Sequence, residues 1–398
     1  MSKVILHIDL NAFFATAESL RHPEWNDEPI IVGGDTFRGV VSTCSYSARK
    51  FGVSSAMPIV EAKRLCPKGH FVSCDFPYYS MLSRSFFAYL KKWSSIIEEA
   101  SIDEGYVDIT KGIKNEKDPL EYLKRLQDGL LKEIGLKSSL GVAPTKFLAK
   151  MGSDMKKPMG ITIIRRKDIP SLLYPLPISD FFGIGRRSVP FLEKEGVMTI
   201  GDLQKKIDED DPKIKKFFGK FYANIKNDLA GKGDDVVDPT PWDPKSVGHS
   251  ETFPFDTDDG EIIRGKLKEL CHYTVLSLKK DEKKTKTVQI VAKDSFFHSY
   301  NRSCSLFEAT DDEETLQKAC LKLYSDNFSG KELRLVGVSF LNLIDPVKET
   351  VQMNIWNYSE YEKMDKTKLL VNELNRKLNK PALVIASKKK KDGNKKGN

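Results

Sequence analysis

Features that would restrict this chain to a specialised class of protein are scarce. Its six histidines show no zinc spacing, and no C-x-x-C pair occurs among its six cysteines, which are Cys44, Cys66, Cys74, Cys271, Cys304 and Cys320. This excludes a disulfide scaffold and a common zinc module, and is typical of a reduced intracellular protein. No apolar run approaches the roughly 18 residues of a transmembrane helix, and we expect no signal peptide, because the first residues lead directly into a strand. We expect a cytoplasmic protein with no membrane partner.

A strong excess of positive charge is also missing from the body of the chain. The net charge is +8, but residues 387–398 carry six lysines against one aspartate, which leaves +3 for the rest. A mildly basic body suits a nucleic-acid partner but does not demonstrate one. The hydrophobic fraction of 40% is that of a globular protein, and 398 residues allow two to four domains.

Strands and helices alternate over residues 3–165, with a candidate hairpin at 96–109. We expect further strands at 3–10, 29–33, 39–45, 71–74, 139–142 and 158–165. We expect helices at 11–20 (capped by Asn11), 45–51, 58–66, 77–94, 119–134 and 145–155 (capped by Thr145). This order predicts an α+β unit, a mixed sheet covered by helices on one face.

The remaining residues form three further regions. Residues 169–233 have no strand signals and read as short helices. Residues 234–246 contain three prolines and are typical of a linker. Residues 247–345 follow the order strand, helix, strand, strand, helix, strand, which predicts a second α+β domain. A tail, 346–398, ends in a lysine run.

Two adjacent acids, Asp103 and Glu104, interrupt the apolar run 100–109, and Asp9 lies in a similar run. Carboxylates are costly in such settings unless cations accompany them. If the two runs pair as strands, the acids could hold two Mg²⁺ ions for phosphoryl transfer, with the Leu10 carbonyl as a further ligand. From the acids alone, a solvent-facing hairpin tip and strand end remain an equal alternative.

Several residues elsewhere in the sequence are candidate phosphate contacts. The first amides of the helix after Asp9, at Phe13 and Phe14, would point toward the metals. The Phe13 ring is better explained as core, whereas a flat Phe14 ring under a sugar would exclude a 2′-hydroxyl. Tyr46 and Arg49 share one face of a short helix, and Lys157 precedes a strand. Each of these charges, taken alone, would be read as solvated surface.

The segment Phe181–Arg187, FFGIGRR, has the pattern of a helix-hairpin-helix motif. Its glycines, Gly183 and Gly185, would allow backbone N–H groups to approach a DNA phosphate without reading the base sequence. Arg186 adds a cation beside them.

Together these stretches resemble the Y-family translesion DNA polymerases, most closely the bacterial DNA polymerase IV group. The resemblance rests on HIDLNAFFATAE, GVVSTCSYSARKFGVSSAMPIVEAKRLCP, ASIDEGYVDIT, LGVAPTKFLAKMGSDMKKPMGI and FFGIGRRSVPFLEKEGVMTIGDL, which occur in the family's order across roughly residues 1–205. It implies a right-hand polymerase fold. The expected parts are a ferredoxin-like palm (1–10 and 75–165), small fingers (11–74), a helical thumb (166–233), a linker (234–246), an α+β little finger (247–345) and the tail.

The resemblance also implies roles for individual residues. Asp9, Asp103 and Glu104, with the Leu10 carbonyl, match the ligands of two Mg²⁺ ions, for which Mn²⁺ can substitute. Phe14 matches the steric gate against ribonucleotides. The matches to triphosphate contacts are Thr43, Tyr46, Arg49 and Lys157. Ser42 ends the segment 39–42 that covers the nascent base pair.

Three features depart from the family's pattern. Gly105 stands where alanine is usual and could loosen its strand. Cys44-Ser45 replaces the usual Ala-Asn, so lesion preference cannot be carried over. Residues 245–345 hold fifteen Lys and Arg against seventeen Asp and Glu, so DNA contacts there must come from local patches. One candidate patch, which could equally be a solvated helix end, is Lys279, Lys280, Lys283, Lys284 and Lys286.

The tail contains QMNIW, whose residues Gln352, Met353, Ile355 and Trp356 resemble the peptide with which bacterial polymerases bind the sliding clamp. An extended peptide with apolar anchors suits a groove.

These observations predict a low-fidelity, template-directed DNA polymerase that acts in translesion synthesis and DNA repair. Its expected partners are primer-template DNA, deoxynucleoside triphosphates and the sliding clamp, and we expect a monomer. Three alternatives remain: a related palm-fold enzyme such as a nucleotide cyclase, a family member that needs accessory subunits, and a catalytically silent DNA- or clamp-binding scaffold.

Overall fold

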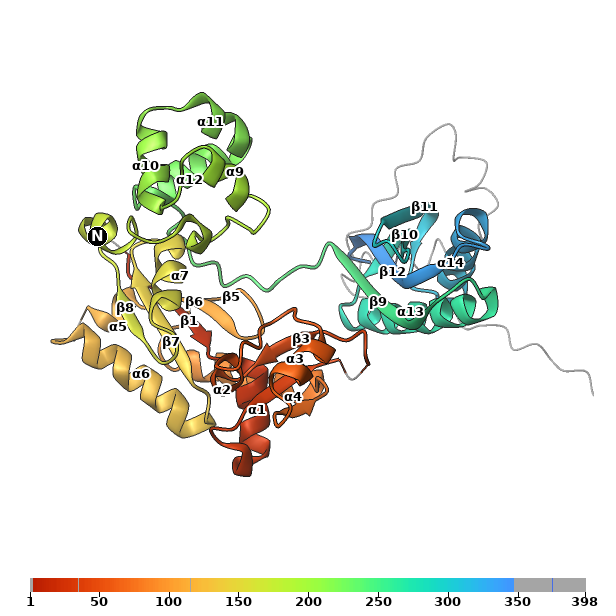
Figure 1. Ribbon diagram of the computed structural model, residues 1–398, viewed down its shortest axis with the longest axis horizontal. Helices are drawn as coiled ribbons and strands as arrows, with labels where there is room; N and C mark the ends of the chain where they lie inside the picture. Colours follow the sequence, from red (N-terminus) through yellow and green to blue (C-terminus); the bar gives the residue numbers. More distant parts are fainter. Residues whose placement is uncertain (1–2, 35, 115, 347–373, 375–398) are drawn as a thin grey trace, which may run out of the picture. The chain divides into compact units, whose positions relative to one another are not determined.

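The computed structural model describes residues 3–34, 36–114, 116–346 and 374 (Figure 1). The chain divides into two compact units, Met1–Trp242 and Asp243–Asn398. The division falls within the proline-containing segment 234–246, which the sequence marks as a linker. Among the described residues, none of the helices combines the length and the apolarity needed to cross a membrane.

A five-stranded mixed sheet forms the centre of the first unit, in the order β5-β6-β1-β7-β8. Strand β1 lies between β6 and β7 and is antiparallel to both, whereas β7 and β8 are parallel. All six residues of β1 are buried, as expected for the central strand. The strands are β1 (Ile5–Leu10), β5 (Ile97–Glu99), β6 (Glu104–Asp108), β7 (Ser138–Ala143) and β8 (Ile161–Ile163).

Helices cover both faces of this sheet, which corrects the expectation of one covered face. Leu6 and Ile8 of β1 join the core formed with α4 (Phe76–Leu90) and α6 (Pro119–Ile134). The other face, which includes His7 and Gly141, lies against α7 (Lys146–Met155). A Cβ at Gly141 would lie 1.9 Å from the Ala149 carbonyl oxygen, so α7 packs on the bare backbone of β7. A short helix, α5 (Thr110–Ile113), follows β6.

A smaller three-stranded sheet, β3-β2-β4, carries its own apolar cluster. Its elements are η1 (Pro23–Trp25), β2 (Ile30–Gly33), β3 (Val41–Cys44), α2 (Tyr46–Arg49), α3 (Ile59–Leu65) and β4 (His70–Val72). The preceding helix, α1 (Phe13–Arg21), instead contributes Phe13, Ala15 and Ala17 to the core of the large sheet. Ile30 and Val32 of β2 belong to the same core, and α1 also packs against β2 and β3, so this helix joins the two sheets.

Residues 166–229 are helical, as the sequence predicts, and no strand occurs among the described residues of this range. The helices α9–α12 cluster together (Figure 1). Their core also includes Ile5 and Tyr106 of the large sheet, so this helical region and the sheet share one core. The elements are η2 (Arg166–Asp168), α8 (Ile169–Leu172), η3 (Ile178–Asp180), α9 (Val189–Lys194), α10 (Ile200–Asp208), α11 (Pro212–Phe218), η4 (Gly219–Phe221) and α12 (Tyr222–Leu229).

The second unit confirms the expected order of strand, helix, strand, strand, helix, strand. Its elements are β9 (Ser246–Thr257), α13 (Gly260–Lys280), β10 (Lys284–Lys293), β11 (Ser299–Thr310), α14 (Glu313–Asn327) and β12 (Leu333–Ile344). The sheet order is β11-β10-β12-β9, and every neighbouring pair is antiparallel. Both helices pack against the sheet through one apolar cluster.

The expected N-cap of α1 is wrong. The cap position is Ala12, at φ 47°, and no side chain caps the helix. Asn11 is buried instead: its Oδ1 accepts a hydrogen bond from the Met159 N–H (2.8 Å), and its Nδ2 donates to Ser139 Oγ (2.9 Å). Two distant segments, which contain Ser139 and Met159, bind this side chain, and a local capping rule cannot anticipate them.

Candidate active site

Two of the expected acids lie directly opposite each other on adjacent strands. Asp9 of β1 pairs in register with Glu104 of β6, so their side chains leave the same face of the sheet. The Leu10 N–H donates to the Asp103 carbonyl at 2.9 Å, which ties together the backbones of the two acid-bearing segments. The predicted pairing of these two runs as strands is confirmed.

Two lysine ammonium groups accompany these acids. Lys150 Nζ lies 3.1 Å from Asp9 Oδ2 and 2.7 Å from Glu104 Oε2. Lys157 Nζ lies 2.7 Å from the same Asp9 oxygen and 2.7 Å from Asp154 Oδ1. The cations that adjacent acids require in an apolar setting are therefore supplied by α7 and the residues that follow it.

The environment shifts the pKa values of the three groups on this face in different ways. Burial alone would raise the pKa of Asp9, but the ammonium groups of Lys157 and Lys150 hold it below the usual value. Burial raises the pKa of Glu104, and the Lys150 hydrogen bond offsets this only in part. Burial and the Lys150 charge lower the pKa of His7 to about 3, so this ring is neutral at pH 7.

The third expected acid, Asp103, is engaged by its own loop. Ser101 Oγ donates to Asp103 Oδ1 at 2.6 Å. Among the described residues, no three His, Cys, Asp or Glu side chains come together as a metal-binding group. The structure therefore brings Asp9 and Glu104 together, with the Asp103 backbone beside them and its carboxylate turned to Ser101.

The residue proposed as a steric gate is held between aromatic rings. Phe14 is half-buried and stacks on Tyr79, with ring centroids 4.3 Å apart and planes 14° apart, while Phe76 meets it edge-on at 6.0 Å. The Tyr79 hydroxyl donates to Glu18 Oε1 at 2.7 Å, which fixes the supporting ring. Phe13 is 2% exposed, in agreement with its expected place in the core.

Of the four expected triphosphate contacts, Thr43 lies on β3, Tyr46 and Arg49 lie on α2, and Lys157 follows α7. The Arg49 guanidinium lies over the Tyr46 ring, 4.4 Å from its centroid, so the two side chains share a face as predicted. Burial raises the pKa of the Tyr46 hydroxyl, which therefore remains a hydrogen-bond donor at neutral pH. Thr43 is half-buried, and the exposed Ser42 has its Oγ 3.4 Å from Cys74 Sγ.

The Cys44-Ser45 departure has a structural explanation. The Cys44 side chain is fully buried in the small-sheet cluster, and its thiol donates to the Val53 carbonyl at 3.4 Å. Ser45 Oγ accepts from the Ala48 N–H at 3.2 Å and so caps α2. Both side chains are used within this part of the fold.

The glycine-rich hairpin precedes α9. Phe181 and Ile184 are buried and anchor the turn, whereas Gly183, Gly185 and Arg186 are exposed. Gly183 has φ +98°, and a Cβ at either glycine would meet nothing within 4 Å. Within the described part of the chain, the N–H groups of these three exposed residues have no hydrogen-bond acceptor. The turn can therefore offer backbone donors to an external anion.

Two further sequence predictions concern the second unit. Gln352, Met353, Ile355 and Trp356 lie outside the described residues. Of the lysine patch, Lys283 forms an ion pair with Asp243 at 2.8 Å, so it is engaged by the linker. Lys279 and Lys280 are exposed in the last turn of α13.

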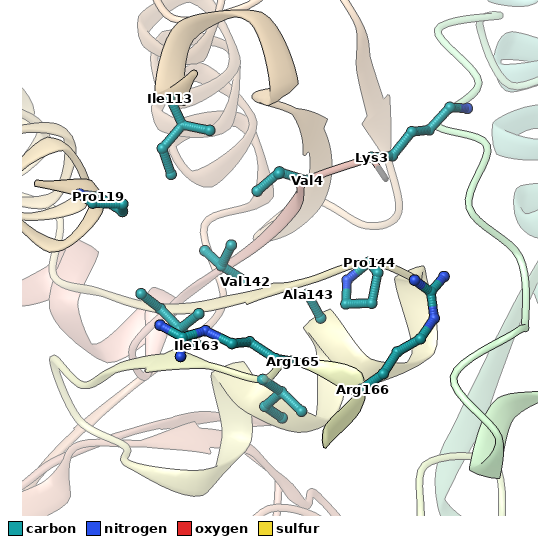
Figure 2. A pocket seen from close by; sticks show the side chains of 11 residues that line it. Lys3, Val4, Ile113, Pro119, Val142, Ala143, Pro144, Ile163, Arg165 and Arg166 are labelled. Carbon is teal, nitrogen blue, oxygen red and sulfur yellow. The ribbon is translucent and has the colours of Figure 1, made fainter. Parts of the chain in front are cut away.

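Figure 2 shows a cavity of about 390 Å³ whose lining includes Lys3 and Val4. These two residues precede β1, whereas Asp9 lies near the other end of that strand. Val4, Val142 and Ile163 are among the apolar residues that line the cavity, and its charged lining residues are Lys3, Arg165 and Arg166. The acids are not part of its wall, so it is a feature separate from the candidate site.

Sequence reasoning missed three residues of the site: Lys150, Asp154 and His7. The first two lie four residues apart on α7, and their ion pair measures 3.4 Å. The helix was expected, so this spacing could have placed both side chains on one face. That this face would meet Asp9 depends on the packing of α7 against β1, which no local signal contains.

Family models match most of the two units. The impB/mucB/samB family model matches residues 8–154, and the model of that family's C-terminal domain matches residues 244–355. DNA polymerase IV 1 of Bacillus subtilis is 34% identical over 379 residues, covering 94% of this chain and 91% of that protein. DNA polymerase IV of Listeria monocytogenes (serotype 4b, strain F2365) is 35% identical over 344 residues, covering 86% and 96%.

Solved structures agree with these relatives. A Y-family DNA polymerase chimera, Dbh-Dpo4(243-245)-Dbh, superposes with a TM-score of 0.75 at 26% identity and covers 86% of this chain and 99% of its own. DinB from Sulfolobus solfataricus superposes with a TM-score of 0.56 at the same identity and coverage. The chain therefore belongs to the impB/mucB/samB family, the Y-family DNA polymerases, and within it to the DNA polymerase IV group.

Proposed function

We propose that this chain is a translesion DNA polymerase that adds deoxynucleotides to a primer end, with Asp9, Asp103 and Glu104 at its reaction centre. The observation that carries the assignment of the centre is the in-register pairing of Asp9 with Glu104 beside the Asp103 backbone. DNA-templated synthesis implies a cytoplasmic enzyme, and we infer that it acts as a monomer.

The residues present fit divalent metal ions. The carboxylates of Asp9 and Glu104 converge on one cationic centre, the Lys150 ammonium, within 3.1 and 2.7 Å, so this face already accommodates positive charge between them. Carboxylate oxygens are the ligands that Mg²⁺ prefers, and Mn²⁺ accepts the same set. Asp9, Asp103, Glu104 and the Leu10 carbonyl would hold two such ions, which would activate the primer hydroxyl and stabilise charge on the leaving phosphate.

The surrounding residues would bind and orient the nucleotide. Tyr46 offers a hydroxyl donor, and Arg49 and Lys157 offer cations, to a triphosphate, with Thr43 on the adjoining strand. The first amides of α1, at Phe13 and Phe14, lack a side-chain cap and are available to the same anion. Phe14, fixed by its stack on Tyr79, would lie under the sugar.

The DNA would be held by contacts that do not depend on sequence. The exposed hairpin at Gly183, Gly185 and Arg186 presents backbone N–H groups suited to phosphate. Ser42 would contact the nascent base pair, because the family resemblance places the fingers over that pair at residues 39–42. Such contacts position a primer-template without reading it, as lesion bypass requires.

Primer extension with Mg²⁺ tests the assignment of the centre. The purified chain should extend a primed template, and Asp103→Ala should reduce the rate by at least roughly 1000-fold, because charge stabilisation in the transition state is lost. Glu99→Ala, which removes an exposed acid from β5, serves as the control. Equal extension by wild type and Asp103→Ala would refute the centre.

The same assay separates the alternatives. Extension by the chain alone excludes both a need for accessory subunits and a silent scaffold. A nucleotide cyclase would convert a triphosphate without primer or template, and the family relationship gives no support to that reading.

We infer that the sliding clamp is a partner, through Gln352, Met353, Ile355 and Trp356. Deleting residues 352–356 should abolish clamp binding in a pull-down and should leave clamp-independent extension unchanged. Deleting the lysine run 388–396 is the matched control, because it removes tail charge and keeps the motif. Clamp binding that survives the first deletion would contradict the inference.

A further inference from the structure

Lys150 occupies a position that the reaction centre, as assigned, does not explain. It lies on α7 and is only 8% exposed, and its ammonium contacts both paired acids, at 3.1 Å for Asp9 and 2.7 Å for Glu104. A third carboxylate oxygen, of Asp154, lies 3.4 Å away. Burying a lysine is costly unless such partners surround it.

The carboxylates here are not all satisfied by separate cations. Asp9 Oδ2 is shared by Lys150 and by Lys157, at 3.1 and 2.7 Å. Three carboxylates, of Asp9, Glu104 and Asp154, therefore meet two ammonium groups. Of the two lysines, Lys150 alone links the opposed strands β1 and β6, because its ammonium bridges Asp9 and Glu104.

We propose that Lys150 is a positioning residue, an internal counter-ion that holds Asp9 and Glu104 together and competes with divalent metal for their oxygens. This inference rests on the proposed function, because it takes Asp9 and Glu104 as metal ligands. Two positive charges cannot share the same pair of oxygens without strong repulsion. Lys150 must therefore withdraw from at least one acid when metal binds, and metal affinity is set lower than the carboxylates alone would give.

The same competition gives Lys157 a role in coupling nucleotide binding to metal binding. In the structure Lys157 is held by Asp9 and Asp154. A triphosphate that attracts Lys157 would remove one cation from Asp9 and so favour metal at that oxygen. Metal binding and nucleotide binding would then be coupled through the two lysines.

Metal affinity distinguishes a lysine that competes with metal from one that is only structural. Removing a competitor should raise the affinity for metal, whereas removing a structural lysine should lower it. Mn²⁺ binding to the full chain, without DNA or nucleotide, can be followed by the electron paramagnetic resonance signal of unbound Mn²⁺. For Lys150→Met we expect affinity to rise by roughly tenfold or more, since one opposing charge is gone. Lys150→Gln should show the same direction, and Lys150→Arg should stay near wild type.

Thermal unfolding supplies a second readout. In EDTA, Lys150→Met should melt roughly 5–10 °C below wild type, because buried carboxylates lose their cation. Added Mn²⁺ should recover most of this loss in the variant and have a smaller effect on wild type. Lys156→Met, a change to an exposed lysine on the same segment, should alter neither measurement.

The outcomes separate this inference from the proposed function. In one outcome, wild type extends primers, but neither Lys150→Met nor Lys150→Gln binds Mn²⁺ more tightly than wild type does. The counter-ion role of Lys150 is then wrong, and the polymerase assignment stands. If wild type neither extends primers nor binds Mn²⁺, both are wrong. Tighter Mn²⁺ binding by the two uncharged variants, with recovery of the melting temperature, supports the role.

Discussion

Gly105 shows how one residue is fitted to its neighbours. It is buried in β6 and pairs with Ile8 of β1 on one side and with Glu99 of β5 on the other. Strand β6 is therefore regular beside the acids, and the glycine does not loosen it as the departure from the family's alanine suggested. A Cβ at this position would lie 2.9 Å from Phe87 Cε1 and 3.0 Å from the Glu98 carbonyl oxygen. The Phe87 ring fills the space that an alanine methyl group would need.

Gly105→Ala should therefore destabilise the protein, although alanine is the family's usual residue there. We expect a loss of about 1–3 kcal/mol in the free energy of unfolding, the usual cost of overpacking. Denaturant unfolding of Gly105→Ala and of Gly105→Ala combined with Phe87→Leu would measure it. The smaller leucine should recover part of the loss, and an Ala variant as stable as wild type would refute this account of the packing.

Phe14 and Phe13 are adjacent in sequence and differ in exposure, which separates their expected roles. Phe14→Ala should relax the preference for deoxynucleotides over ribonucleotides by roughly 10- to 100-fold, because the ring that would meet a 2′-hydroxyl is removed. Single-nucleotide incorporation of the paired substrates measures the ratio. Phe13→Leu changes a ring that is 2% exposed, so it should lower stability and leave the ratio unchanged. Unaltered sugar selectivity in Phe14→Ala would count against the gate.

At the scale of elements, α7 links two parts of the first unit. Lys150, one turn along the helix from Lys146, contacts the acids. Lys146 contacts Glu98 of β5 at 3.0 Å and Asp234 of the linker at 2.6 Å. The Asp238 N–H donates to Glu98 Oε2 at 2.9 Å, and Val237 is 5% exposed in the core shared with the helical region. The first part of the linker is therefore attached to the five-stranded sheet and to α7.

Removing Glu98 should release this attachment. In Glu98→Ala we expect faster hydrogen exchange at the Asp238 amide, with about 1 kcal/mol or less lost in global stability, because the pair is partly solvated. Exchange measured by mass spectrometry over residues 231–238 would report it. Glu99→Ala, next to it but exposed, should leave exchange unchanged. Equal exchange in the two variants would show that Glu98 does not hold the linker.

For the molecule as a whole, Asp228 of α12 is a source of pH dependence. Burial, with repulsion from Asp234 as a smaller cause, raises its pKa from 3.8 to about 6. No cation among the described residues pairs with this carboxylate. Because its pKa is higher folded than unfolded, the folded state binds the proton more tightly. Stability therefore decreases as pH rises from about 4 to about 6 and is constant above.

Asp228→Asn should remove this penalty. We expect a gain of roughly 1–3 kcal/mol in the free energy of unfolding at pH 7.5 and a much smaller gain at pH 4, where the folded aspartate is protonated and the unfolded one is partly protonated. Thermal unfolding at the two pH values measures the difference. Asp180→Asn, at an exposed position, is the control. A gain of the same size at both pH values would point to a cause other than the charge.

Local sequence determined the elements whose ends are fixed by their own residues. Helix α6 spans the predicted Pro119–Ile134, because Asp118 accepts a hydrogen bond from the Leu120 N–H, proline fits its first turn and Gly135 ends it at φ +82°. Thr145 caps α7 as predicted, by accepting from the Leu148 N–H. The acids, too, stand out in the sequence as a charged pair within an apolar run, although that run alone left a solvent-facing hairpin tip as an equal alternative.

Tertiary structure alone decided which distant side chains meet. Asn11 bonds to Ser139 and Met159 instead of capping its helix, because β7 and the segment between α7 and β8 bring those groups to it. Lys150 reaches Asp9, which is 141 residues away in sequence, because α7 packs on the glycine backbone of β7. Hydrogen bonds and charge pairs act over a few ångströms of space, so their partners are set by packing, which local sequence signals do not specify.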